Sequence, residues 1–202
     1  MKKKKFKVVA LPKATKTLIG MTVPEQKNGN VGLLVEDVLI DIGYPLDKQA
    51  TVDIEELQVE CKTRTKEARS ALQIGTMTVN DIINTPYHSS SIKEKFQQQF
   101  RVIHSDIFRI ITSARIYDFS DSYIQKLVER DYELGRQKFI EFKDNDAEYP
   151  NYVRGENADF YWEKKEHNSY EFRASKSAMQ QYEQLANSTP IFNSLFEKKQ
   201  DK

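Results

Sequence analysis

The stretch from residue 57 to residue 63 constrains the fold most strongly, because apolar and polar side chains alternate along it. Successive side chains of a β-strand point to opposite faces of a sheet, so this alternation predicts a strand with one buried face. On such a strand Val59 and Cys61 face the core. Glu60 and Lys62 then lie together on the opposite face.

A helix is expected before this strand, because apolar side chains recur at helical spacing over residues 32–42. Gly43 and Pro45 follow as a signal that ends the helix. Neighbouring residues in a helix lie about 100° apart, so Glu36 and Asp37 fall on different flanks of the apolar stripe. One of the two, Glu36, can therefore face a functional site.

Strands and helices are also mixed along the rest of the chain. Further strands are expected at 72–79, 100–104, 107–117 and 137–142, with a hairpin formed by 161–164 and 169–174. Further helices are expected at 89–99, 120–134 and 176–186, and an acidic loop at 143–159. Asp121 suits the N-cap of the helix at 120–134, and Gly135 suits its C′ position. The pattern predicts an α/β fold with a mixed central sheet flanked by helices.

Composition narrows the functional classes. A chain of 202 residues fits a single domain. Its single cysteine, Cys61, excludes an internal disulfide framework, and three histidines without metal-ligand spacing disfavour a zinc hydrolase. No apolar run approaches the roughly 20 residues of a membrane span, so we expect a soluble, cytoplasmic protein with no membrane partner.

Charge does not indicate a nucleic-acid partner by itself, because 31 lysines and arginines are balanced by 30 acidic residues. The informative pattern is Asp53 followed by Glu60 and Lys62, which brings two carboxylates and an amine to one side of a strand. Carboxylates are the ligands that Mg²⁺ prefers, and an amine can hold a water or meet charge on a phosphate. A solvated sheet face is the alternative interpretation.

Two blocks of sequence resemble a known family. Residues 28–36 read NGNVGLLVE, and residues 53–63 read DIEELQVECKT. Together they are similar to the paired signature of the MutH mismatch-repair endonuclease and its GATC-type restriction relatives, within the PD-(D/E)xK nuclease superfamily. Fainter similarities continue at 18–25, 91–96 and 170–173.

The resemblance implies a restriction-endonuclease-like domain over residues 1–202, whose two lobes form a DNA-binding cleft. Its approximate lobes are 13–117 for catalysis and 118–202 for recognition. By the same resemblance Asp53 and Glu60 would bind Mg²⁺, Glu36 would complete the acidic cluster, and Lys62 and Lys95 would act on water and phosphate. Double-stranded DNA would be contacted by Asn28, Lys93, Arg173 and Lys176.

Several functions are compatible with these residues. One is a type II restriction endonuclease that cuts at GATC-like sites, for which a homodimer on the DNA would supply the second active site. Another is a mismatch-repair endonuclease that nicks one strand and depends on a MutL-type activator. A third, of another class, is a DNA-binding regulatory module without cleavage. For Glu36, Lys95 and Arg173, an ordinary solvent-facing role is the alternative.

Overall fold

A computed structural model of the chain describes residues 11–23, 30–44, 46, 52–54, 58–66, 72–166 and 168–188. The described residues belong to two compact units, one within Met1–Arg69 and Lys93–Ile116, the other within Ser70–Ile92 and Tyr117–Lys202. Residues 72–92 thus belong to the second unit, although they fall inside the range 13–117 expected for the catalytic lobe. Asn28 lies outside the described residues.

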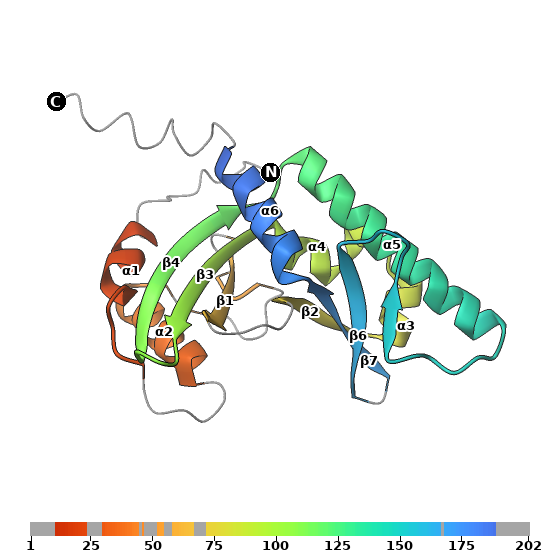
Figure 1. The fold of residues 1–202 in the computed structure, drawn as a ribbon, viewed down its shortest axis with the longest axis horizontal. Helices are drawn as coiled ribbons and strands as arrows, with labels where there is room; N and C mark the ends of the chain where they lie inside the picture. The colour runs from red at the N-terminus through yellow and green to blue at the C-terminus, as the bar shows by residue number, and fades with distance from the viewer. Residues whose placement is uncertain are drawn as a thin grey trace. The chain divides into compact units, whose positions relative to one another are not determined.

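The first unit is built around a three-stranded sheet (Figure 1). Its strands are β1 (Glu60–Thr65), β3 (Gln98–Ser105) and β4 (Ile110–Asp118), and its helices are α1 (Leu11–Leu18), α2 (Asn30–Asp41) and α4 (Ser91–Gln97). The strand order is β1-β3-β4, so β1 is an edge strand. β1 and β3 run parallel, with Glu60 opposite Gln99 and Lys62 opposite Arg101.

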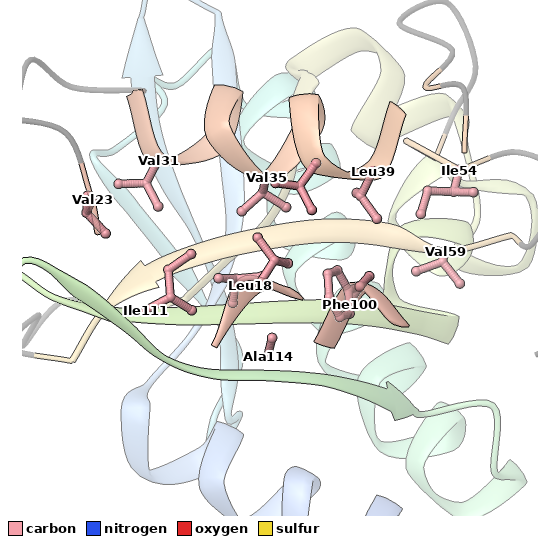
Figure 2. Packing of buried hydrophobic residues seen from close by; sticks show 13 residues of the cluster. Leu18, Val23, Val31, Val35, Leu39, Ile54, Val59, Phe100, Ile111 and Ala114 are labelled. Carbon is pink, nitrogen blue, oxygen red and sulfur yellow. The ribbon is translucent and has the colours of Figure 1, made fainter. Parts of the chain in front are cut away.

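The core of this unit lies between the two N-terminal helices and one face of the sheet. Figure 2 shows Val31, Val35 and Leu39 pointing from α2 toward the sheet, and all three are buried. They pack in one cluster with Phe100 of β3 and Ile111 of β4. This face carries the apolar side chains of the alternating strands, which leaves the opposite face for polar ones.

The second unit contains a four-stranded antiparallel sheet in the order β2-β7-β6-β5. The strands are β2 (Leu72–Thr78), β5 (Tyr152–Arg154), β6 (Phe160–Glu166) and β7 (Ser169–Ala174). The helices are α3 (Val79–Asn84), α5 (Ser122–Asp144) and α6 (Lys176–Ser188), with a 3₁₀ turn, η2, at Tyr87–Ser89. The predicted hairpin and final helix are therefore confirmed.

Aromatic side chains fill the core between α5 and this sheet. The ring of Tyr132 lies 5.4 Å from Trp162 and 5.7 Å from Phe172, and Phe139 lies 4.8 Å from Tyr170. These edge-to-face arrangements are the ones that aromatic pairs prefer, and each adds about 0.5–1.5 kcal/mol beyond area burial. One buried face of the sheet is thus fixed by α5.

The interpretation of residues 120–142 as a helix followed by a strand is wrong. Asp121 is the expected N-cap, since its side chain accepts from the Tyr123 and Ile124 amides at 2.9 and 3.4 Å. The helix does not end at Gly135, however, and continues to Asp144. Gly135 is instead a buried residue in the middle of α5, where the Trp162 ring leaves no room for a side chain.

The expectation of one mixed central sheet also needs correction, because the described strands form two separate sheets. β2 pairs with β7 of the hairpin and belongs to a different sheet from β1. The expected loop at 143–159 contains the end of α5 and the short strand β5. What stands is a mixed α/β fold. None of the helices in the described ranges is both long and apolar enough to cross a membrane.

Candidate active site

Two lysines converge on one buried carboxylate in the first unit. Lys62 Nζ lies 2.5 Å from Glu60 Oε1, and Lys95 Nζ lies 3.7 Å from the same oxygen. Glu60 is only 3% exposed, whereas the lysine side chains are 20% and 28% exposed. The carboxylate is therefore buried, whereas both lysine side chains are partly exposed to solvent.

Local sequence explains how these three side chains meet. Glu60 and Lys62 are two residues apart on β1, so both project from the face opposite the apolar core. Lys95 comes from α4, which leads directly into β3, the parallel neighbour of β1. The two predicted lysines are thus brought to Glu60 by one strand and one short helix.

Asp53 is held beside this group by the backbone. Its Oδ2 accepts a hydrogen bond of 2.7 Å from the amide of Cys61, the residue between Glu60 and Lys62. The next residue, Ile54, forms an isolated antiparallel bridge with Val59, which folds the chain back immediately before β1. Asp53 therefore approaches the strand at Cys61, as the spacing predicts.

Glu36 extends from α2 and is half-buried. Its carboxylate is near enough to influence the Cys61 thiol. Burial raises the pKa of that thiol most strongly, the Asp53, Glu60 and Glu36 carboxylates raise it further, and Lys62 lowers it. Three acidic groups thus surround Cys61, and the raised pKa makes the thiol a poor nucleophile.

The donor chemistry at this site suits a hard cation such as Mg²⁺. Oε2 of Glu60 is buried and has no hydrogen-bond partner among the described residues. Asp53 directs one carboxylate oxygen to an amide, which leaves its second oxygen as a donor atom. Within the described ranges, however, no three histidine, cysteine or acidic side chains are grouped closely enough to hold a metal ion. Glu36, Asp53 and Glu60 therefore share a region without forming a closed ligand cage.

Two polar residues of β3 belong to the same face and were not predicted as site residues. Gln99 is fully buried, and its Oε1 accepts from Arg101 Nε at 2.9 Å and from Nη2 at 2.6 Å. Gln99 Nε2 donates to the Lys95 carbonyl at 2.8 Å. The available sequence signal was the alternation of Gln99 and Arg101 with the apolar Phe100 and Val102.

The predicted DNA-contacting residues that the structure describes are divided between the two units. Lys93 lies half-buried on α4, and Lys176 is the exposed first residue of α6 in the second unit. Arg173 lies on β7, where Nη1 is 2.6 Å from Glu163 Oε2 and 3.4 Å from Glu171 Oε2. The guanidinium expected to contact DNA is therefore ion-paired to two glutamates.

No protein-family model matches the chain, and no curated protein matches it.

Proposed function

We propose that this protein is a Mg²⁺-dependent DNA endonuclease whose active site lies around Glu60. The observation that supports this most is that Lys62 and Lys95 both lie near the buried carboxylate of Glu60. Asp53 is held close to this group by its hydrogen bond to the amide of Cys61, the residue after Glu60. A structural ion pair needs only one lysine. Two partly exposed lysine side chains beside a buried carboxylate suit the binding of an anionic substrate at a metal site.

Asp53 and Glu60 would hold the metal, which would polarise the phosphate and activate a water. Lys62, within hydrogen-bond reach of Glu60 Oε1, would orient the attacking water or meet charge that develops on the phosphate. Lys95 lies farther from Glu60 and suits contact with a phosphate oxygen. Glu36 would add negative charge that favours the cation.

The substrate class follows from the resemblance to MutH and the GATC-type restriction enzymes. We propose a type II restriction endonuclease that acts in the cytoplasm on double-stranded DNA at a short, GATC-like site. Because one chain offers one active site, cutting of both strands would require a homodimer or two successive encounters. A nicking enzyme that needs a MutL-type activator is the alternative with the same chemistry.

Incubation of supercoiled plasmid with the protein and Mg²⁺ tests the proposal. Discrete linear fragments are expected for a restriction enzyme, whereas accumulation of nicked circles would favour the nicking alternative. Lys62→Ala should slow cleavage by roughly 10²–10⁴-fold. Lys66→Ala, at the exposed lysine just after β1, is the matched control and should cut at the wild-type rate.

Intact plasmid with Mg²⁺ or Mn²⁺, on methylated and unmethylated substrates, would contradict the nuclease proposal. If the protein still retarded DNA in a gel under those conditions, it would be a binding module without cleavage. Equal cleavage by the wild-type protein and Lys62→Ala would place the activity elsewhere in the chain.

A further inference from the structure

We infer that Gln99 is a positioning residue that holds Lys95 near Glu60 and Arg101 on the same sheet face, and this role rests on the proposed nuclease function. Gln99 lies on β3, the parallel neighbour of the strand that carries Glu60 and Lys62, and its Cα is the register partner of Glu60. Its amide connects the two elements that bring cations to the site, α4 and β3.

The first connection holds the end of α4. Lys95 lies in the last turn of this helix, where backbone carbonyls lack partners within the helix. Gln99 Nε2 supplies a partner by donating to the Lys95 carbonyl at 2.8 Å. Because Lys95 Nζ lies 3.7 Å from Glu60 Oε1, a shift of this helix end by about an ångström would change the ammonium position appreciably.

The second connection holds the guanidinium of Arg101. Gln99 Oε1 accepts from both Nε and Nη2, which restricts rotation of the guanidinium plane. Arg101 is 5% exposed and lies opposite Lys62 in the parallel register, so its side chain projects from the same sheet face. A third positive charge is thus kept on the face that carries Glu60.

A carboxamide can serve both connections at once. Glutamine provides two N–H donors and an acceptor oxygen, whereas ionised glutamate provides acceptors alone and methionine provides almost neither. Gln99→Glu should therefore retain the Arg101 contact and lose the donor to the Lys95 carbonyl. Gln99→Met removes both connections while keeping a side chain of similar length.

The test measures single-turnover cleavage and DNA affinity separately. Gln99→Met should lower the cleavage rate by roughly 10- to 100-fold, the usual effect of losing a residue that orients active-site groups. The Kd for DNA should change by less than about threefold, because the Gln99 side chain is buried. Gln98→Met, at the adjacent half-buried glutamine, is the matched control and should retain the wild-type rate.

Measuring the effect of Gln99→Glu both in the wild-type protein and in the Lys95→Ala variant separates a positioning role of Gln99 from a general loss of stability. If Gln99 acts through Lys95, Gln99→Glu should slow the wild-type protein and have little further effect on Lys95→Ala. Equal slowing in both backgrounds, or a wild-type rate for Gln99→Met, would overturn the inference. Gln99→Glu serves as the second variant if Gln99→Met fails to fold. Wild-type protein without cleavage would instead overturn the proposed function, and the role of Gln99 with it.

Discussion

The Cys61 amide donates a hydrogen bond to Asp53 Oδ2 at 2.7 Å, although Asp53 is also the expected metal ligand. Under the proposed function, one carboxylate would therefore have two tasks, which use different oxygens. Its Oδ2 fastens the segment before β1 to the strand, and under the proposed function its other oxygen would supply a donor atom for a cation. The substitution Asp53→Asn can separate the structural role from the chemical one, because the asparagine amide retains an acceptor oxygen and loses the negative charge.

Replacement of Asp53 by asparagine should abolish cleavage and leave the fold intact. The amide oxygen can still accept from the Cys61 N–H, whereas the negative charge that attracts Mg²⁺ is lost. Asp53→Ala should also abolish cleavage and lower the free energy of unfolding by about 1–3 kcal/mol, because the amide loses its acceptor. Plasmid cleavage and urea denaturation of the two variants check both effects. Cleavage by Asp53→Asn at the wild-type rate would refute the assignment of Asp53 as a metal ligand.

The ion pair between Arg173 and Glu163 should compete with DNA. Arg173 cannot offer its full set of N–H donors to a phosphate or base while Nη1 lies 2.6 Å from Glu163. We expect Glu163→Gln to tighten DNA binding by roughly threefold to tenfold at low salt, because it removes the ionic attraction between residue 163 and Arg173 and one charge that repels DNA. Arg173→Ala should weaken binding.

Titrations over a range of salt concentrations distinguish what Arg173 contacts. A phosphate contact would lower the salt slope by about one and weaken all sequences alike, whereas a base contact would relax sequence preference. Glu166→Gln is the control, because Glu166 is the exposed last residue of β6, the strand that also carries Glu163. This variant should leave the affinity for DNA nearly unchanged. Unaltered binding by Glu163→Gln would show that this ion pair does not face the DNA.

Stability should fall as the pH rises above about 10, because buried tyrosines in the second unit resist ionisation. Burial raises the pKa of Tyr132 to about 12, and burial also raises the pKa values of Tyr87 and Tyr182. Between an unfolded value of about 10 and these raised values, the folded state keeps more protons than the unfolded state. The stability contribution is therefore complete below pH 10 and is lost as the pH rises through the folded pKa.

Urea denaturation between neutral pH and about pH 11 measures this loss. The raised pKa of Tyr132 contributes about 3 kcal/mol to the free energy of unfolding below pH 10, since each pKa unit corresponds to about 1.4 kcal/mol. This contribution is lost completely only when the hydroxyl is ionised in the folded state as well. Tyr132→Phe keeps the ring and removes the ionisable hydroxyl, so its stability should decline less steeply with pH. An identical decline in the wild-type protein and Tyr132→Phe would show that Tyr132 does not govern it.

Local patterns predicted the part of the candidate site that depends on neighbouring residues. Alternation with a period of two was sufficient to place Glu60 and Lys62 on one face, and helical spacing was sufficient to place Glu36 on a helix. The position of Gln99 depends instead on the parallel pairing of β1 with β3. Alternation shows which side chains share a face of a strand, but it does not show which strands become neighbours.

The same limit explains the incorrect single sheet. Residues 72–78 were correctly expected to form a strand, yet their pairing with β7 depends on a chain segment that is remote in sequence. The aromatic residues that cover this second sheet come from α5, which was expected to be a helix and a strand. Tertiary packing thus decided both the strand with which β2 pairs and whether residues 137–142 form a helix or a strand, because local sequence preferences are too weak to decide either.

Gly135 provides the clearest case, because glycine is ordinarily a signal that a helix ends. Here a Cβ at residue 135 would lie 2.7 Å from Trp162 Cδ1, so close packing against β6 explains the glycine within α5. Gly135→Ala should gain about 1 kcal/mol of helix propensity and lose about 1–3 kcal/mol to overpacking against the indole ring. A net loss of stability is therefore expected in urea denaturation.

Gly32→Ala is the matched control for this substitution. Gly32 also lies in a helix, α2, but a Cβ there would be 4.0 Å from its nearest neighbour, Thr63 Oγ1. That variant should gain stability by about 0.5–1 kcal/mol, because alanine favours the helix and nothing must move. If Gly135→Ala were stabilised to the same extent, the Trp162 ring would have to shift without cost. Close packing against Trp162 would then not explain why residue 135 of α5 is a glycine.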